Sequence, residues 1–263
     1  MLGRIHSIET MGMLDGPGIR TIFFLQGCPL KCLYCHNPDS QKYYTKLQMT
    51  AEEVVDMSLK YKAYYDVSGG GVTFSGGEPL VQGAFLVKAI KALKEHGIHV
   101  AIDTSGYGNK TYFDEVISLA DMILLDIKHF DEHKHKHMTG VSMKDQNIFL
   151  NKLSSYKGKL WVRHVMVPGY TDNLNSMDSL FKRVKPFAQC IEKIEILPFH
   201  QLAIDKYDDL GLDYTLKGVP EMNIDKAKEF EHYINDKFKQ YITERVGEKH
   251  YLLSQTSNKL YSV

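Results

Sequence analysis

Three cysteines, Cys28, Cys32 and Cys35, lie close together in one short stretch, and thiolates in this number and spacing point to metal chemistry. Only three and two residues separate them, so one loop can gather the three sulfurs around a single centre. A disulfide framework needs an even number of cysteines and is typical of small secreted chains. The fourth cysteine, Cys190, is far away in the sequence. The trio therefore indicates metal ligands, with plain structural thiols as the simplest alternative.

Two kinds of centre suit three thiolates. A structural zinc site is closed by four ligands, and His36 is the nearest residue that would supply the fourth. A four-iron cluster held by only three cysteines leaves one iron open to an outside ligand, which is typical of a reactive centre. The spacing favours the cluster and leaves zinc as the alternative.

The residues around these cysteines resemble a known family. The pattern C-x3-C-x2-C, with Tyr34 before the last cysteine, is similar to the motif of the radical S-adenosylmethionine (radical SAM) enzymes. Within that family, the chain resembles the activating enzymes of glycyl radical enzymes over about residues 3–240. The segments that carry this resemblance are 3–7, 15–20, 26–28, 34–37, 75–78, 103–104, 125–128, 163–169 and 197–200.

The resemblance implies two cofactors. Cys28, Cys32 and Cys35 would hold a [4Fe-4S] cluster, and its open fourth iron would take S-adenosylmethionine. The expected contacts to S-adenosylmethionine are Tyr34, Cys35, His36, Gly77, Glu78, Asp103, Asp126, Ile127, Lys128, His129 and His200.

Several of these residues have ordinary structural alternatives. Gly77 suits a turn, and the glycines around it lack the Gly-Lys-Ser/Thr ending of a phosphate loop. Asp126 suits a cap, and His36 and His200 suit packing. By the resemblance, however, Gly77 and Glu78 hold the ammonium of the methionyl group, Asp126 holds the ribose hydroxyls and Lys128 faces the carboxylate. The two histidines and Tyr34 would then surround the adenosyl group.

The resemblance also implies the reaction and its partners. One electron from the cluster would cleave S-adenosylmethionine into methionine and a 5′-deoxyadenosyl radical. That radical would take a hydrogen atom from a glycine of pyruvate formate-lyase and leave a glycyl radical there. Asp15, which is otherwise a turn former, is expected to contact the glycine loop of this partner and is counted as catalytic with the three cysteines. The low potential required implies a flavodoxin-like electron donor.

Two alternatives stay open. The first is an activase of a different glycyl radical enzyme, because such activases use the same chemistry. Several of them carry a cysteine-rich insertion, whereas residues 36–70 contain no cysteine, which favours pyruvate formate-lyase. The alternative from a different class is a non-catalytic zinc-binding interaction module.

Length and composition limit the domain organisation and the classes of partner. The chain has 263 residues, 43% of them hydrophobic, and this length suits a single domain, 1–263, with a core at about 15–200 and a helical extension at about 220–263. The formal net charge is +0, so no overall field favours nucleic acid. No apolar run is long enough for a membrane span, and few cysteines that stay reduced indicate a cytoplasmic protein. We expect a monomer.

Strand and helix signals alternate along the chain. The predicted strands are 4–8, 19–25, 72–74, 98–104, 122–127, 160–167 and 193–197, and the predicted helices are 50–65, about 86–96, 111–120, 145–156, 174–188 and one from about 225. Counted from residue 19, this gives six β/α units and an α/β fold with a parallel sheet. The resemblance implies a partial (β/α)6 barrel. In such folds the site lies at the carboxyl ends of the strands, where the singled-out motifs also fall.

Three further features carry weaker signals. Four histidines at 129–137 resemble a metal tract, but such a run beside lysines is more typical of a solvated surface, so we predict no metal there. Asp103, Thr104 and Asp126 are expected to converge, which raises the hypothesis of a bound monovalent cation. Arg163 suits either an ion pair or a contact to the nucleotide.

Overall fold

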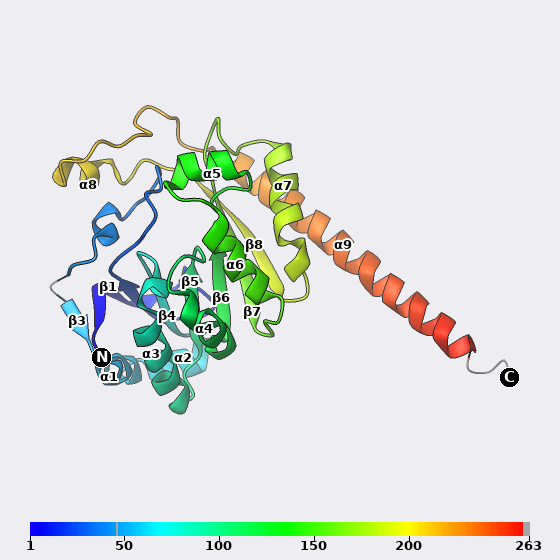
Figure 1. The fold of residues 1–263 in the computed structure, drawn as a ribbon, viewed down its shortest axis with the longest axis horizontal. Coiled ribbons are helices and arrows are strands. Elements are labelled where there is room, and N and C mark those ends of the chain that lie inside the picture. Colours follow the sequence, from blue (N-terminus) through cyan, green and yellow to red (C-terminus); the bar gives the residue numbers. More distant parts are fainter. Residues whose placement is uncertain (46, 260–263) are drawn as a thin grey trace.

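An eight-stranded sheet forms the centre of the molecule (Figure 1). The computed structural model describes residues 1–45 and 47–259, with side chains through residue 245. The strand order is β3-β1-β2-β4-β5-β6-β7-β8. The strands are β1 (Gly3–Gly12), β2 (Arg20–Leu25), β3 (Leu47–Met49), β4 (Gly71–Gly76), β5 (Val100–Thr104), β6 (Met122–Asp126), β7 (Lys159–Met166) and β8 (Ile191–Pro198).

The helices follow the strands in the expected alternation. They are α1 (Ala51–Leu59), α2 (Lys62–Ser68), α3 (Gly83–Glu95), α4 (Phe113–Leu119), α5 (Glu132–Thr139), α6 (Lys144–Leu153), α7 (Leu174–Val184), α8 (Ile204–Asp209) and α9 (Ile224–Lys259). Short 3-10 turns at Pro38–Gln41, Pro79–Gln82, Lys110–Tyr112 and Lys185–Phe187 connect some of them.

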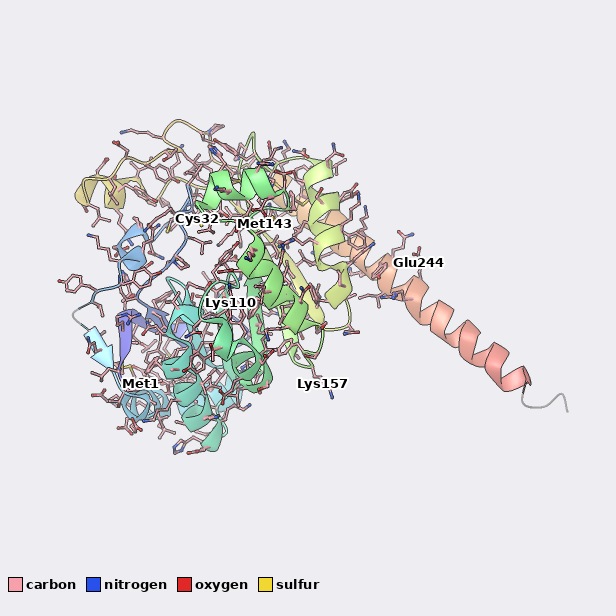
Figure 2. All side chains as sticks on the ribbon, viewed as in Figure 1. Met1, Cys32, Lys110, Met143, Lys157 and Glu244 are labelled. Carbon is pink, nitrogen blue, oxygen red and sulfur yellow. The ribbon has the colours of Figure 1, made fainter. Side chains whose placement is uncertain are left out.

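Six strands, β2 and β4 to β8, pair in parallel, while β1 runs antiparallel to β2 and β3. In the described part of the chain β3 and β8 do not pair with each other, so the sheet stays open. The prediction of six β/α units in an α/β fold with a partial barrel is confirmed. Because the strands are parallel, the loops that follow them all gather at one end of the sheet. Cys32 lies at that end, whereas Lys157, just before β7, lies at the other (Figure 2).

The core lies between the sheet and its helices. Met122 to Leu125 of β6 are fully buried, as expected for a strand covered on both faces. On α3, Leu86, Ala89, Ile90 and Leu93 follow helical spacing and are also fully buried, so their predicted face is the one that packs on the sheet.

The structure differs from the predicted elements in several places. The single helix predicted at 50–65 is two helices, α1 and α2, although its capping box of Thr50 and Glu53 is present. The elements α5, α8 and β3 were not predicted. The sequence of α5 has no apolar period, and its helix is fixed by the cap at Asp131 and by the left-handed Gly140 at its end.

The long helix α9 packs against β8 and α7 at its start, and its later turns extend away from the rest of the molecule (Figure 1). It accounts for the helical extension expected from about residue 220, except that residues 260–263 lie outside the described part. No helix among the described residues combines the length and the apolar character that crossing a membrane requires.

Candidate active site

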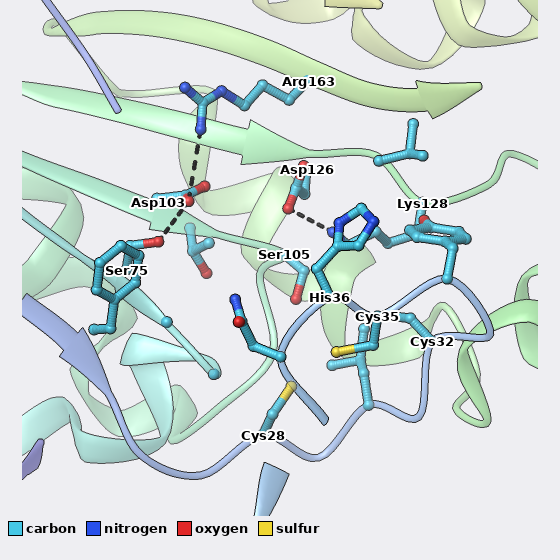
Figure 3. Close-up of a pocket in the computed structure, with 18 of the residues that line it drawn as sticks. Cys28, Cys32, Cys35, His36, Ser75, Asp103, Ser105, Asp126, Lys128 and Arg163 are labelled. Carbon is cyan, nitrogen blue, oxygen red and sulfur yellow. Dashed lines mark hydrogen bonds and ion pairs between the residues drawn. The ribbon is translucent and has the colours of Figure 1, made fainter. Parts of the chain in front are cut away.

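A cavity of about 290 Å³ opens at the carboxyl ends of the parallel strands (Figure 3). Its walls come from the cysteine loop after β2, from the ends of β4, β5 and β6, and from residues within β7 and β8, so the sheet wraps around it. The predicted site residues that line it are Asp15, Cys28, Cys32, Tyr34, Cys35, His36, Gly77, Asp103, Asp126 and Lys128.

Backbone contacts hold the cysteine loop, residues 26–37, in place. Lys31 N donates to Thr139 O at 2.7 Å and Leu33 N donates to Met138 O at 2.9 Å, so the last turn of α5 anchors the loop from outside. On the other side, Gly27 N donates to Ser40 O at 2.7 Å. A histidine-rich helix with no predicted function therefore supports the cysteine loop.

The three thiols are free, partly buried and directed at the same cavity. Burial raises the pKa of Cys32 to about 12, and it also raises the pKa of Cys28. Both thiols are therefore protonated in the protein alone, and a bound metal centre must displace those protons.

The ligand geometry bears on the zinc alternative. In the part of the chain that the structure describes, no three His, Cys, Asp or Glu side chains converge closely enough to hold one metal ion. Three thiolates that each bind a different iron of a cluster lie farther apart than three ligands of one zinc ion. The three thiols nevertheless line one cavity, as ligands of a shared centre must.

Arg163 of β7 is the centre of an ionic network inside the sheet. Its guanidinium donates to Asp15 Oδ1 and to Glu195 Oε2, each at 3.0 Å, and lies 3.7 Å from Asp103 Oδ2. It also donates to the carbonyl of Leu14. Burial alone would lower the pKa of Arg163, but the carboxylates of Asp103 and Asp15 raise it. The network ties the turn between β1 and β2 to the opposite side of the sheet.

Asp103, at the end of β5, presents an unsatisfied acceptor to the cavity. Ser75 Oγ donates to its Oδ2 at 2.7 Å, while its buried Oδ1 has no partner. Burial raises the pKa of Asp103 to about 7, although Arg163 opposes this. A buried acceptor without a partner indicates a missing donor, because such groups are normally satisfied.

Lys128 and Asp126 form the second charged pair of the cavity. Lys128 Nζ lies 2.5 Å from Asp126 Oδ2, and the ring of Tyr34 is 5.9 Å from the same nitrogen. Burial alone would lower the pKa of Lys128, but Asp126 raises it well above its ordinary value. The ammonium is therefore charged and faces the cavity (Figure 3).

The comparisons with known proteins agree with this geometry. The Radical SAM superfamily matches residues 22–180. The chain is 47% identical over 236 residues to the pyruvate formate-lyase-activating enzyme of Clostridium pasteurianum, with 90% of this chain and 98% of the relative covered. It is 45% identical over 244 residues to the enzyme of the same name from Staphylococcus aureus strain USA300, with 90% and 97% covered. The chain belongs to the pyruvate formate-lyase-activating enzymes of the radical SAM superfamily.

Solved radical SAM structures share the fold at low sequence identity. A radical SAM methyltransferase from Sphaerobacter thermophilus matches with a TM-score of 0.59 at 11% identity, over 82% of this chain and 64% of that one. SuiB from Streptococcus suis, bound to S-adenosylmethionine, matches with a TM-score of 0.58 at 16% identity, over 84% and 46%. This chain thus spans less than two thirds of either solved chain, and the likeness concerns the fold alone.

Radical SAM enzymes use a [4Fe-4S] cluster and S-adenosylmethionine, and the residues present suit both. Cys28, Cys32 and Cys35 lie in the matched region and supply three thiols to one cavity. The unpartnered Asp103 Oδ1 suits an ammonium group, and the Lys128 ammonium suits a carboxylate.

His36 and His200 form a stacked pair at the mouth of the radical SAM cavity. Their ring centroids are 4.1 Å apart with an angle of 10° between the planes, and His36 Nε2 donates to His200 O at 3.3 Å. Burial lowers the pKa of His36, so its ring favours the neutral form. His36 lines the cavity, whereas His200 does not and stacks on the ring of His36.

Glu78 does not line the cavity in this structure, and its contact to S-adenosylmethionine stays a prediction. Its side chain is fully buried and lies outside the cavity lining. Both carboxylate oxygens are already used: Oε1 accepts from Leu80 N and Thr104 Oγ1, and Oε2 accepts from Ser105 N and Ser105 Oγ. In this structure these donors hold the Glu78 carboxylate against the end of β5. Gly77 does line the cavity, as expected.

Ile127 and His129, two further expected contacts, do not line the cavity, and their contact to the cofactor stays a prediction. Side chains alternate along an extended segment, so the neighbours of Lys128 point to the opposite side. Ile127 is fully buried, and His129 Nδ1 accepts from Phe130 N and Asp131 N at the start of α5. His129 therefore helps to cap a helix.

Sequence reasoning assigned no role to several residues of the site and left open whether Asn37 contacts the cofactor. Ser75, Ser105 and Asn37 line the cavity, and Glu195 completes the Arg163 network. Ser75 directly precedes the Gly-Gly-Glu motif, and Asn37 follows the last cysteine motif, so their position in the sequence was a usable signal. Glu195 lies within a strand and carried no such signal.

Proposed function

We propose that this chain activates pyruvate formate-lyase by forming a glycyl radical on it, as a [formate-C-acetyltransferase]-activating enzyme. One observation carries the proposal: the three motif cysteines share a cavity with Asp103, Asp126 and Lys128, in a chain 47% identical to an enzyme of this name. The cofactors, when bound, supply one electron and a 5′-deoxyadenosyl radical that removes a hydrogen atom from a glycine of the partner. The residues of the chain bind and orient these cofactors and shield them from water.

Cys28, Cys32 and Cys35 are the proposed ligands of the cluster. Their loop is fixed by backbone hydrogen bonds on both sides, so the thiols are held in place before the cluster binds. With only three thiols in the loop, one iron is left for the amino and carboxylate groups of S-adenosylmethionine. We assign the amino group to Asp103 and the backbone around Gly77, and the carboxylate to Lys128.

The adenosyl group is proposed to lie against Tyr34 and the ring of His36. Tyr34 is buried at the cavity wall with an unpartnered hydroxyl, and His36 presents the face of its ring. Asp126, which lies beside Lys128, is assigned to the ribose hydroxyls. These flat and apolar surfaces exclude water from a reactive group.

Asp15 is proposed to contact the glycine loop of pyruvate formate-lyase. It lines the cavity from the turn between β1 and β2, and Arg163 holds its carboxylate in place. The neighbouring side chain of Leu14 is 84% exposed, so the same turn reaches the surface. This turn therefore connects the cavity to the side from which a partner loop can enter.

The electron donor, the oligomeric state and the location are also proposals. We propose a flavodoxin-like electron donor, a monomer, a cytoplasmic location and no role for nucleic acid, supported by the reduced thiols and a formal net charge of +0. A monovalent cation near Asp103, Thr104 and Asp126 stays a prediction, supported by the unpartnered Asp103 Oδ1. Activity that stays unchanged when potassium and sodium are replaced by a bulky organic cation would argue against it.

The test is an anaerobic one. The protein is reconstituted with iron and sulfide, reduced, and given S-adenosylmethionine with and without pyruvate formate-lyase. We expect 5′-deoxyadenosine and a glycyl radical signal in the electron paramagnetic resonance spectrum of the partner. Cys28→Ala should abolish both and lower the iron content.

Cys190→Ala is the matched control, because Cys190 lies outside the cavity and its thiol donates to Phe187 O. This variant should keep the iron content and both products. Stoichiometric zinc with no 5′-deoxyadenosine would contradict the proposal. A product without any radical on pyruvate formate-lyase would point to a different glycyl radical enzyme as the partner.

A further inference from the structure

Gln146 of α6 is a fully buried polar side chain that reaches the ends of two strands. Its Nε2 donates to Ser105 O at 2.9 Å and to Asp126 O at 3.1 Å. The ladder between β5 and β6 ends where Thr104 faces Leu125, so these two carbonyls lie just beyond the paired residues. The amide of Gln146 therefore bridges β5 and β6 just beyond the point where the hydrogen bonds between these two strands end.

Arg183 of α7 fixes the orientation of that amide. Its Nη2 donates to Gln146 Oε1 at 2.8 Å and to Asn147 Oδ1 at 2.8 Å. If the amide of Gln146 were turned over, its oxygen would face two carbonyls and its NH₂ group would face a guanidinium. Arg183 thus ensures that both protons of the amide point at the strand ends.

The two carbonyls belong to residues of the cavity. Ser105 lines it and donates twice to the buried Glu78, while Asp126 lines it and pairs with Lys128. The bridge by Gln146 therefore links the β5 side of the cavity, with Asp103, to the β6 side, with Lys128. These are the groups assigned to the amino group and the carboxylate of one methionyl group.

We infer that Gln146 is a positioning residue that sets the distance between the two sides of the S-adenosylmethionine site, an inference that rests on the proposed function. A ligand held at both ends needs its two anchors at a fixed separation, and small misplacements weaken such binding strongly. Gln146 itself does not line the cavity.

The experiment measures S-adenosylmethionine binding to the reconstituted protein by equilibrium dialysis. Gln146→Met, which keeps the size but removes the amide, should raise the Kd about tenfold, equivalent to about 1.4 kcal/mol. Iron content should stay at the wild-type value, and the KM for S-adenosylmethionine should rise more than kcat falls. The change that S-adenosylmethionine causes in the electron paramagnetic resonance spectrum of the reduced cluster should require correspondingly more ligand.

Asn147→Leu is the matched control, since Asn147 also accepts from Arg183 but is exposed and does not reach the strands. It should bind as the wild type does. Gln146→Glu keeps the shape and the bond to Arg183 while removing both donated hydrogen bonds, and it carries the test if Gln146→Met does not fold. The double change Gln146→Lys with Arg183→Met restores a donor to the two carbonyls and should recover most of the affinity.

Two results separate the possible failures. If the wild type binds S-adenosylmethionine and forms 5′-deoxyadenosine but the Gln146 variants bind it equally well per folded molecule, this inference is wrong and the proposed function stands. If the wild type neither binds S-adenosylmethionine nor forms the product, both are overturned.

Discussion

The two sides of the cavity are held by different kinds of contact. On the cofactor side, buried side chains close a continuous hydrogen-bond network from Glu78 through Ser105 to Gln146. On the open side, the connection after β8 reaches the cysteine loop through Lys206, which donates to Asn37 Oδ1 at 2.9 Å and lies 3.6 Å from Asp39. Lys206 and Asp39 are 39% and 32% exposed.

This difference separates a rigid half from an adjustable one. A buried network in which every group is satisfied is costly to open, because each broken bond leaves a desolvated polar group. Exposed ion pairs contribute little and are screened by salt. The side that must fix a small ligand is therefore built stiffly, and the side that must admit a partner is built from contacts that open at low cost.

The largest effect is expected from Glu78→Gln on the rigid side. The new NH₂ group would face N–H and O–H groups that donate to the carboxylate of Glu78 in the wild type. We expect this clash of donors to lower the free energy of unfolding by about 3 kcal/mol. Urea unfolding of the cluster-free protein measures it. Glu52→Gln, at an exposed pair with Lys88, is the control and should change stability little. An equal change in both variants would remove the distinction between the two sides.

The stability of the protein should depend on pH through His135, a buried residue of α5, the helix that supports the cysteine loop. His135 Nε2 is hydrogen-bonded to Tyr107 Oη at 2.7 Å, and burial lowers its pKa to about 4. The unfolded chain, with a pKa near 6.5, binds this proton more readily, so stability is lost as pH falls from about 6.5 towards 4.

His135→Gln tests this contribution. Between pH 7 and pH 5 the wild type should lose about 2 kcal/mol more stability than the variant, measured by urea unfolding at the two pH values. His133→Gln, two residues away on the exposed face of the same helix, should follow the wild type. Identical slopes for all three proteins would show that His135 is not held neutral.

Asp15→Asn should act on the partner and spare the cofactor. It weakens the bond from Arg163, and we expect a loss of about 1 kcal/mol in stability. The rate of glycyl radical formation on pyruvate formate-lyase should fall several-fold, while S-adenosylmethionine binding by dialysis stays unchanged. A matching loss of S-adenosylmethionine binding would place Asp15 in the rigid half.

The smallest effect on stability is expected from Lys206→Met, below about 0.5 kcal/mol. The loss of this contact should instead let the connection after β8 move away from the cysteine loop more often. We expect this as faster proteolytic cutting within residues 199–222. Raising the salt concentration from 0.1 M to 1 M, which shortens the Debye length from about 10 Å to about 3 Å, should speed cutting of the wild type but not of the variant. If salt leaves the wild type unaffected, ionic contacts do not hold this segment.

Sequence reasoning recovered the parts that depend on local patterns. The six β/α units follow from alternating buried strands and helices with an apolar face, and the cysteine loop was evident from its spacing. The helix α5 was missed because its sequence, EHKHKHMT, is polar; only the fold shows that His135, Met138 and Thr139 are its buried face. Tertiary contacts, and not a local apolar pattern, therefore determine which face of α5 is buried.

Orientation was harder to predict than proximity. A motif brings Glu78 and His129 next to the site, but it does not say that Glu78 faces Ser105 or that His129 faces the start of α5. Gln146 gave no signal at all, because a glutamine inside a helix is usually exposed and its contacts come from strands about 20 and 40 residues earlier.

The position of Cys190 has a consequence for oxidative damage. It precedes β8, where its carbonyl accepts from Leu160 N, so it lies at the amino ends of the strands and roughly 20 Å along the sheet from the cysteine loop. No spare thiol is therefore within reach of the three in the cavity. Oxidation of any one of them beyond the sulfenic stage is irreversible, and a single such event would permanently inactivate the molecule.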